Sequence, residues 1–326
     1  MSISLITPFK NAAPFLEECI ASVLKQDFTD WEWILVDDGS TDTSKEIVLG
    51  AKDPRFQLLP NEGVGILPAL QTAQKHITGN FVSRMDADDI MPPKKLSTLL
   101  DCLKQHGKGY VATGKVKYFG VEPVSAGYLE YEAWLNERIE KQDHYKHLYR
   151  ECVVASPNWM MFREDFDKTE GYNNLSYPED YDQIFRWEMH GLKIACTSDI
   201  THLWREHSKR TSRNSPHYQQ KAFFQLKTHH FLKNHNNPSI CLVGAKKKGK
   251  LIASLLQERK VPFRWVETKP SIIGQKIMNT FIEDLSQLEK SDSVILSIYP
   301  ANKEREKLEL LLLKKGYEIG DNVWYF

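Results

Sequence analysis

Two aspartates separated by a single residue, Asp86 and Asp88, are the residues of this sequence best suited to bind a cation. They end an apolar segment at 80–85 that predicts a strand, and side chains two positions apart in an extended chain project to the same side. Two carboxylates at the carboxyl end of a parallel strand suit a hard divalent cation that also holds phosphate oxygens. A solvated acidic turn is the alternative, and this string alone leaves both interpretations open.

A second acidic string, Asp37-Asp38-Gly39-Ser40, follows the apolar segment 31–36. A carboxylate there can accept the ring N–H of uracil, thymine or guanine, whereas cytosine and adenine offer no matching imide donor. Asp, Gly and Ser also form turns, so a turn that begins a helix is the alternative interpretation.

The elements that must position these strings alternate between strand and helix over the first hundred residues. Strands are expected at 3–7, 31–36, 56–59 and 80–85. Helices are expected at 14–25, from 41–43 onward, at 66–76 and at 92–106. Alternation at this spacing predicts a parallel sheet with crossover helices, and therefore an α/β domain.

The rest of the chain predicts a less regular middle and a second, smaller unit. We expect helices at 128–151, 181–190 and 218–233, and strands at 158–162, 240–243, 263–266 and 294–298. Helix-breaking residues at 234–238 mark a boundary. The predicted domains are therefore residues 1–237 and residues 238–326.

Composition excludes several classes of protein. The 326 residues correspond to about two domains. Lys+Arg and Asp+Glu both number 43, so there is no global basic field to gather nucleic acid. No stretch approaches 18 apolar residues, and residues 1–6 lack the basic segment of a signal peptide. Five cysteines without a C-x-x-C pair indicate reduced thiols, so we expect a cytoplasmic protein without a transmembrane segment.

The two acidic strings, in this order and on this alternation, resemble the catalytic domain of glycosyltransferase family 2, which has the GT-A fold. Further strings that follow the order of the family are 4–11, 19–26, 61–63, 171–172, 179–182 and 205–207. The resemblance covers roughly residues 1–215. It implies an α/β fold: a Rossmann-like GT-A domain with a mostly parallel sheet, followed by a small Rossmann-like α/β domain.

The resemblance also implies roles for particular residues. Those expected around the nucleotide are Thr7, Phe9, Asp38, Arg84 and Asp86. Asp86 and Asp88 are expected at a Mn²⁺ or Mg²⁺ ion, and Asp180 is expected to be the catalytic base. Arg84 is included as a substitute, because the chain has Ala69-Leu70-Gln71 where many members carry an Arg-Asn pair.

Two of these roles have open alternatives. His207 resembles a histidine that completes the metal shell in some relatives, but a phosphate contact on a basic loop with Arg205, Lys209 and Arg210 is equally consistent. Asp180 stands where a helix begins, so it can be an acidic helix cap instead of a base.

The function that the resemblance implies is metal-dependent, inverting transfer of a sugar from a nucleoside diphosphate sugar, with UDP expected. The expected acceptor is a hydroxyl of a glycan or lipid-linked glycan in bacterial surface polysaccharide assembly, in the cytoplasm or at the inner face of the membrane. A sugar nucleotidyltransferase is disfavoured, because residues 7–11 contain no glycine. A non-catalytic sugar-nucleotide-binding or scaffold protein is the other alternative, and Asp86, Asp88 and Asp180 argue against it.

The C-terminal string 244–250 has the G-x-x-x-x-G-K spacing of a phosphate-binding loop. Leu251 replaces the Ser or Thr that such a loop requires, and Lys246 stands where a dinucleotide fingerprint needs glycine. Glu267 alone matches the acidic residue expected at the next strand. We therefore expect a module for packing or docking that binds no dinucleotide.

Overall fold

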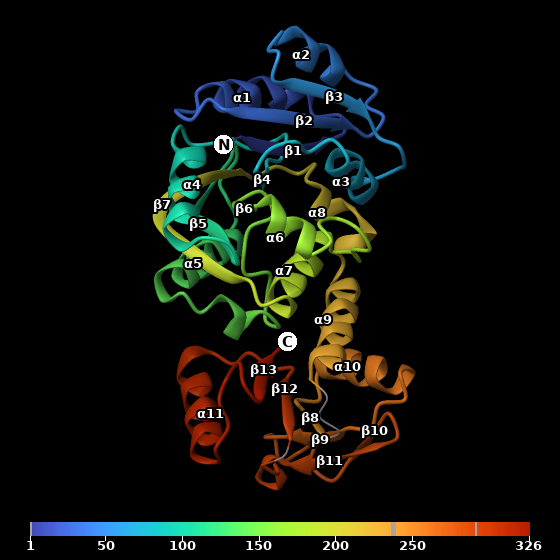
Figure 1. Ribbon diagram of the computed structural model, residues 1–326. Coiled ribbons are helices and arrows are strands. Elements are labelled where there is room, and N and C mark those ends of the chain that lie inside the picture. Colours follow the sequence, from blue (N-terminus) through green and yellow to red (C-terminus); the bar gives the residue numbers. More distant parts are fainter. Residues whose placement is uncertain (1, 236–238, 291) are drawn as a thin grey trace. The chain divides into compact units, whose positions relative to one another are not determined.

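The computed structural model describes residues 2–235, 239–290 and 292–326 (Figure 1). It divides into two compact units. The first comprises Met1–His144 and Val153–Asn214, and the second comprises Tyr145–Cys152 and Ser215–Phe326. The predicted boundary between residues 237 and 238 lies outside the described residues. Each unit is described by itself below.

The first unit contains a mixed sheet with helices along it. Its strands are β1 (Ile3–Phe9), β2 (Trp31–Asp37), β3 (Phe56–Pro60), β4 (Phe81–Arg84), β5 (Tyr110–Phe119), β6 (Trp159–Phe162) and β7 (Lys193–Arg205). Its helices are α1 (Ala13–Leu24), α2 (Ser44–Gly50), α3 (Ile66–Gln74), α4 (Lys95–His106), α5 (Ala126–Lys141), α6 (Arg163–Lys168), α7 (Glu179–Met189) and α8 (Thr211–Asn214).

The strand order of this sheet is β3-β2-β1-β4-β6-β5-β7. The four strands β1 to β4 are parallel to one another. Strand β6 is antiparallel to both β4 and β5, and β7 is parallel to β5. Because β1, β2 and β4 run in the same direction, their carboxyl ends meet at one edge of the sheet. Both acidic strings of the sequence lie at this edge.

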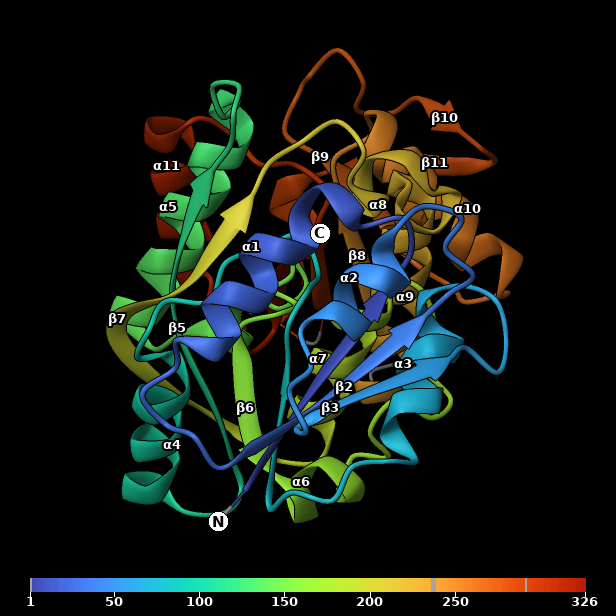
Figure 2. The ribbon, with the colours of Figure 1, turned by 90° about the horizontal axis from the view of Figure 1, so that it is seen from above.

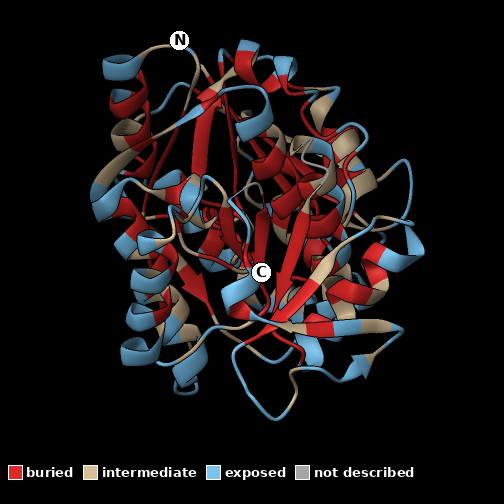
Figure 3. Cartoon of the chain, turned by 90° about the horizontal axis from the view of Figure 1, so that it is seen from below, coloured by how far each residue is buried: buried red, intermediate tan, exposed pale blue. Residues whose placement is uncertain are grey.

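The core of the first unit explains why the parallel strands read as continuous apolar runs. Side chains of β1, β2 and β4 pack with α1, α2 and α4 in one cluster, which includes Leu5, Leu16, Trp33 and Leu99. Helix α3 packs on β1 and β2. Figure 2 shows α1 and α2 over the strands, and Figure 3 shows that the strands are largely buried whereas the helices expose one side. Strands covered on both faces are therefore mostly apolar along their length.

The middle of the chain differs from the prediction. Helix α5 ends at Lys141, not at residue 151, because Gln142 adopts the left-handed conformation with φ 51° and ends it. The long strands β5 and β7 were not predicted. Strand β7 is rich in polar residues, and a register shift opposite Lys115 interrupts its pairing with β5.

The second unit is a smaller, mostly parallel α/β structure. Its elements include β8 (Ile240–Val243), α10 (Lys247–Glu258), β9 (Arg264–Glu267), β10 (Lys276–Ile277), β11 (Thr280–Asp284), β12 (Ser293–Leu296), α11 (Asn302–Lys314) and β13 (Val323–Tyr325), preceded by α9 (Gln220–Asn234). The strand order is β10-β11-β9-β8-β12-β13, in which only the β10–β11 pair is antiparallel. This is the Rossmann-like order, which reverses between β8 and β12.

The glycine-rich string of this unit has a packing role. A Cβ atom at Gly249 would lie 2.0 Å from the Gly244 carbonyl oxygen, so α10 approaches the end of β8 only because this residue is glycine. Glu267 Oε2 accepts a hydrogen bond of 2.9 Å from the Ala245 N–H. The close approach and the bond account for Gly249 and Glu267 without a cofactor, and the absence of dinucleotide binding stays a prediction.

Two other sequence expectations concern the whole chain. Among the described residues, no helix is both long and apolar enough to cross a membrane. All five cysteines are free, and four of them are buried.

Candidate active site

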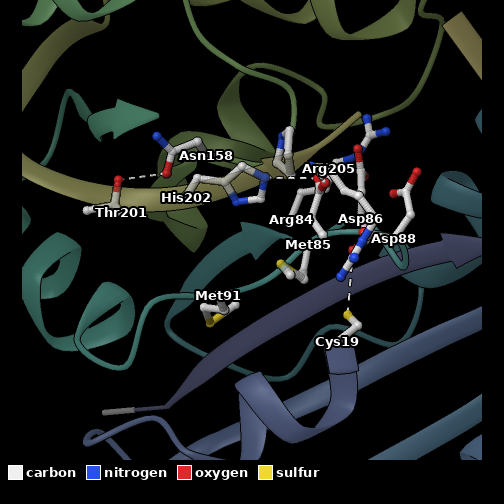
Figure 4. A network of polar contacts seen from close by, with 12 residues as sticks. Cys19, Arg84, Met85, Asp86, Asp88, Met91, Asn158, Thr201, His202 and Arg205 are labelled. Atoms are coloured by element: carbon white, nitrogen blue, oxygen red, sulfur yellow. Dashed lines mark hydrogen bonds and ion pairs between the residues drawn. The ribbon is translucent and has the colours of Figure 1, made fainter. Parts of the chain in front are cut away.

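The Asp86–Asp88 segment begins directly after β4, and Arg84 holds its first carboxylate. The Arg84 Nε–H donates a hydrogen bond of 2.8 Å to Asp86 Oδ1. Arg84 is buried, whereas the side chains of Asp86 and Asp88 are 23% and 29% exposed. Figure 4 shows the three side chains together beyond the end of the strand. The two aspartate side chains are therefore partly accessible, and the buried Arg84 fixes the orientation of Asp86.

The structure brings His207 to Asp88, as the sequence had suggested only by resemblance. His207 Nε2 lies 2.8 Å from Asp88 Oδ2, and the imidazole ring lies 4.4 Å from the ring of Phe15 on α1, centroid to centroid. The Nδ1 atom of His207 is buried without a hydrogen-bond partner among the described residues. Two ligands of one cation lie about 3 Å apart when each is about 2.1 Å from the ion, so this spacing fits a shared cation.

The donor set at this site is small. Within the described ranges, no three His, Cys, Asp or Glu side chains are grouped so that they alone could hold a metal ion. A cation bound by one or two carboxylates, with the remaining positions taken by substrate phosphates and water, is the usual arrangement for Mg²⁺ at phosphate sites. The residues fit that kind of cation, which binds together with a diphosphate.

Asp38 is held at the carboxyl end of β2 by two donors. Its Oδ1 atom accepts hydrogen bonds from the Asn61 side-chain amide (2.6 Å) and the Gly65 N–H (2.8 Å), and its Oδ2 atom lies 3.6 Å from Lys10 Nζ. Gly65 has a φ of 96°, a conformation that favours glycine and that turns its N–H toward the carboxylate. One carboxylate oxygen is thus fixed and the other is directed to the neighbourhood of a lysine.

The neighbouring Asp37 has a structural role. It is buried and accepts hydrogen bonds from the Ser40 N–H (2.9 Å), and Lys45 Nζ lies 3.0 Å from its Oδ2 atom. Burial raises the pKa of Asp37, but the bonds from Ser40 and Lys45 outweigh it, so that the pKa is lower than usual. Of the two adjacent aspartates, Asp38 is therefore the one available to a ligand.

Thr7 and Phe9 lie near the carboxyl end of β1. Both are buried, and the Thr7 hydroxyl donates to the Met85 carbonyl oxygen (2.6 Å) while accepting from the Trp33 indole N–H (2.8 Å). These bonds tie β1 to β2 and to the residue that leads into Asp86. The Thr7 side chain thus supports the segment that carries the aspartates, and the base contacts expected of Thr7 and Phe9 stay predictions.

Asp180 is a partly exposed residue in the first turn of α7. The Tyr181 N–H donates to Asp180 Oδ1 (2.8 Å) within this turn, whereas the capping position of the helix is Pro178. Desolvation and the adjacent Glu179 raise the pKa of Asp180 to about 7, although Arg84 and the Tyr181 N–H oppose the shift. A carboxylate with a pKa near neutrality is suited to accept a proton at neutral pH.

Arg84 links the two acidic segments. Its Nη1 atom lies 3.3 Å from Glu179 Oε1, and its Nε–H binds Asp86. Glu179 is buried, so it is not positioned to receive a proton from an external acceptor. Burial opposes the charge of Arg84, but Asp86 and Glu179 keep its pKa above the usual value. The diphosphate contact expected of Arg84 stays a prediction.

Three basic residues near His207 were expected to favour a diphosphate by their charge. Arg205 is buried and donates to the Asp88 carbonyl oxygen (2.7 Å) and to Glu18 Oε2 (2.5 Å). The Arg210 guanidinium lies 5.0 Å from the centre of the Trp204 ring and 3.3 Å from Glu206. Lys209 is exposed. Two of the three thus stabilise the structure around the site.

Sequence reasoning missed the residues that hold the candidate site residues. Asn61 and Gly65 on Asp38, and Glu18 on Arg205, had no recognised role. Asn61 stood in one of the strings that carry the resemblance, so that string contained a signal. Glu18 is an exposed residue of a helix, and no pattern distinguishes it from the others.

Comparison with known proteins decides the family. The model of glycosyl transferase family 2 matches residues 4–170, which is more than half of the chain. The chain belongs to glycosyltransferase family 2. The matched family 2 domain includes Asp38, Asp86 and Asp88, whereas Asp180 and His207 lie beyond it.

Relatives of the family 2 domain include characterised and uncharacterised bacterial enzymes. The chain is 34% identical over 110 residues to the UDP-Glc:alpha-D-GlcNAc-diphosphoundecaprenol beta-1,3-glucosyltransferase WfgD of Escherichia coli, a match over 33% of this chain and 44% of that protein. It is 24% identical over 216 residues to glycosyltransferase GlyG of Streptococcus pneumoniae, over 63% of this chain and 71% of that one. The chain therefore spans less than half the length of WfgD, and 34% of the uncharacterised glycosyltransferase EpsJ of Bacillus subtilis.

Solved structures share the fold. Residues 1–349 of S. aureus TarS in complex with UDP-GlcNAc superpose with a TM-score of 0.57 at 19% identity, over 78% of this chain and 72% of that one. The mannosyltransferase PcManGT from Pyrobaculum calidifontis, in complex with GDP-Man and Mn²⁺, gives a TM-score of 0.50 at 19% identity, over 78% and 69%. The α/β architecture predicted from the sequence, of the GT-A type, is confirmed.

Proposed function

We propose that the protein is a metal-dependent, inverting glycosyltransferase that moves a sugar from a uridine diphosphate sugar to a hydroxyl of a glycan or lipid-linked glycan. One observation carries the proposal. Asp88 Oδ2 and His207 Nε2, from side chains that are 29% and 17% exposed, are hydrogen-bonded at 2.8 Å beyond β4, at the edge of the sheet where Asp38 follows β2. Possible metal ligands beyond β4 and a possible acceptor for the base beyond β2, the two strands that flank β1, suit a nucleoside diphosphate.

Asp86, Asp88 and His207 are the residues that would hold the cation, Mn²⁺ or Mg²⁺. Both ions accept carboxylate oxygens, and Mn²⁺ accepts imidazole more readily than Mg²⁺ does. When bound, such a cation neutralises charge on the leaving diphosphate. Asp86 and Asp88 would otherwise repel the diphosphate, so we expect nucleotide and cation to bind cooperatively.

Asp38 is the residue that we propose for recognition of the base. Its Oδ1 atom already accepts from Asn61 and Gly65, which orients the carboxylate. Its Oδ2 atom, 3.6 Å from Lys10 Nζ, is the one that would accept the imide N–H of uracil. Guanine also carries a ring N–H. The relative WfgD is named for UDP-Glc and the TarS structure contains UDP-GlcNAc, which favours uracil.

Asp180 is the residue that we propose as the base. Inversion requires the acceptor oxygen to attack opposite the leaving group, with a proton acceptor within hydrogen-bond reach of that hydroxyl. The pKa of Asp180, raised to about 7, suits this proton transfer, and its partner Glu179 is occupied by Arg84. The charge of Glu179 raises the pKa of Asp180. Glu179 itself is bonded to Arg84 and so would not take the proton of the acceptor hydroxyl.

The proposed setting is bacterial surface polysaccharide synthesis, in the cytoplasm or at the inner face of the membrane. The name of WfgD contains a diphosphoundecaprenol acceptor, which is a lipid-linked glycan of the proposed class.

A thermal-shift panel of nucleotides and nucleotide sugars, each with and without Mn²⁺, tests this function. A ligand that binds only the native state raises the melting temperature. We expect UDP and UDP-sugars with Mn²⁺ to give the largest rise, and ADP and CMP little. Asp38→Ala should reduce the preference for UDP by about 1–3 kcal/mol, because it removes the acceptor of a buried hydrogen bond.

The exposed carboxylate Asp101 on α4 offers a control, and Asp101→Ala should keep the preference. Equal shifts with all nucleotides would refute the role of Asp38. Binding of a UDP-sugar without release of its sugar to any hydroxyl acceptor, or to water, would favour the non-catalytic binding protein.

A further inference from the structure

Asp89 follows Asp88 directly but belongs to the interior. It is 1% exposed, and both of its oxygens are occupied: Oδ1 accepts from the Arg205 N–H (2.7 Å) and Oδ2 lies 2.9 Å from His202 Nε2. Asp89 thus faces β7 instead of the accessible edge where Asp88 lies. It connects the segment that carries Asp88 to the strand that leads to His207.

A second buried pair continues this connection. The Lys95 Nζ atom on α4 lies 3.3 Å from His202 Nδ1 and donates to the Pro157 carbonyl oxygen (2.6 Å). Burial and the neighbouring lysine hold the pKa of His202 well below its usual range, so the imidazole is neutral. Lys95 then donates to Nδ1, and the Nε2–H of His202 donates to Asp89. Three side chains from three segments form one ordered chain of hydrogen bonds.

The backbone repeats this link. Ile90 and Leu203 form an isolated antiparallel bridge, with N–H to carbonyl distances of 3.1 Å in both directions. In the pairing of β5 with β7, Thr201 is the extra residue between the partners of Lys115 and Val116. Such a bulge re-aims the side chains that follow it, here His202. Figure 4 shows His202 on the side of β7 that faces the segment with Asp86 and Asp88.

A buried polar chain of this kind needs an explanation beyond stability. Even a buried ion pair can often be replaced by apolar residues of similar volume without loss of stability, so stability alone does not account for this buried polar chain. The network contacts Arg205, two residues before His207, and includes the residue after Asp88. Asp88 is therefore next to Asp89, and His207 is two residues from Arg205, whose N–H Asp89 binds.

We infer that Asp89, supported by His202 and Lys95, is a positioning residue that sets the spacing between Asp88 and His207 for a divalent cation. The inference rests on the proposed function, because it takes Asp88 and His207 to be cation ligands. Asp89 itself does not touch the cation. Changing residues that orient metal ligands typically lowers metal affinity by about 10–100-fold.

The test measures Mn²⁺ uptake in the presence of UDP, from the loss of the free-ion signal in electron paramagnetic resonance. Asp89→Asn offers one acceptor oxygen where two are needed, so one of the bonds to Arg205 and His202 is lost. We expect it to lower Mn²⁺ affinity by about 10–100-fold, while affinity for UDP without metal stays close to that of the unaltered chain.

Two further variants separate positioning from stability. Asp165 is also buried and accepts a backbone N–H, from Gly109 at 2.8 Å, so Asp165→Asn is the matched control and should leave Mn²⁺ affinity unchanged. His202→Gln can still donate to Asp89 and accept from Lys95, so it should retain Mn²⁺ affinity, whereas His202→Leu should lose it as Asp89→Asn does.

The possible outcomes distinguish this inference from the proposed function. If Asp89→Asn binds Mn²⁺ as tightly as the unaltered chain, or if Asp165→Asn loses as much affinity at an equal drop in melting temperature, the positioning role of Asp89 is refuted and the proposed function stands. If the unaltered chain takes up no Mn²⁺ with UDP, both the cation ligands and this inference are refuted.

Discussion

At the scale of single residues, Asp180 shows how the surroundings of a carboxylate determine what it can do. Desolvation and the charge of Glu179 raise the pKa of this partly exposed residue to about 7, and Arg84 and the Tyr181 N–H limit the rise. The sequence places Glu179 and the beginning of a helix beside Asp180. Glu179 raises the pKa of Asp180 and the helix terminus lowers it, and the sequence does not show which effect is larger. The balance depends on burial, which only the fold provides.

Replacing Asp180 by asparagine tests the proposed base. Asp180→Asn is nearly isosteric, so we expect donor affinity to stay within a few-fold while transfer falls by about 10²–10⁴-fold, the usual contribution of a general base. Transfer of radiolabelled sugar and UDP binding measure the two effects. Glu188→Gln, on the exposed side of the same helix, is the control and should keep full activity. Near-normal turnover of Asp180→Asn, with loss in Glu179→Gln, would assign the base to Glu179.

The pH dependence follows from the same environment. A base works in its deprotonated form, so kcat/KM should rise with pH and level off above about 7. Because the charge of Glu179 raises the pKa of Asp180, Glu179→Gln should move this rise to lower pH. A pH–rate profile of both proteins measures the shift. A rise centred near pH 4, or one that Glu179→Gln leaves in place, would be inconsistent with the proposed base.

At the scale of elements, the parallel half of the sheet was predictable and the other half was not. Strands β1, β2 and β4 are buried on both faces, so their apolar runs identify them in the sequence. The two acidic strings lie at the carboxyl ends of β2 and β4. Strand β7 instead contains Thr197, Asp199 and Thr201. It pairs with β5, and Thr201 donates a hydrogen bond to Asn158. The position of His207 depends on this strand, which explains why only the resemblance connected it to Asp88.

Gly114 on β5 tests how tightly the junction with β7 is packed. A Cβ atom there would lie 2.5 Å from Thr201 Oγ1, which donates to Asn158 Oδ1 (2.8 Å). Gly114→Ala should therefore lower the free energy of unfolding by about 1–3 kcal/mol, because the packed junction must shift. Urea unfolding measures the loss. Gly127 in α5 has open space around it, and Gly127→Ala should leave stability unchanged or raise it. An equally stable Gly114→Ala protein would contradict the packing described.

At the scale of the whole molecule, the chain passes between the two units more than once. Residues Tyr145–Cys152 belong to the second unit although Val153–Asn214 return to the first. Within the second unit, the Tyr149 ring is stacked on the C-terminal Phe326, with 5.3 Å between centroids and 4° between planes. The breaker residues at 234–238 mark a single boundary between two continuous segments. They could not predict that Tyr145–Cys152 belong with the C-terminal residues.

Phe326 tests this arrangement. It is 4% exposed, and its N–H donates to the Leu296 carbonyl oxygen (2.9 Å). Phe326→Ala should destabilise the second unit by about 3–5 kcal/mol, the usual loss for a buried phenylalanine. UDP binding should persist at temperatures where the protein remains folded, because the candidate site residues lie in the first unit. Leu313→Ala, at a side chain that is 61% exposed, should change little. Unchanged melting of Phe326→Ala would contradict the buried stack.

Calorimetric titration of UDP with and without Mn²⁺ tests the central claim most directly, because it requires neither the acceptor nor the donor sugar. If Asp88 and its neighbours bind the cation together with the diphosphate, Mn²⁺ should strengthen UDP binding by about 5–150-fold, the usual range of coupling between two ligands. Asp88→Ala should abolish this gain, whereas Asp101→Ala should keep it. Equal affinity for UDP with and without Mn²⁺ or Mg²⁺ in the unaltered protein, or a full gain in Asp88→Ala, would contradict a metal-dependent glycosyltransferase site at Asp88.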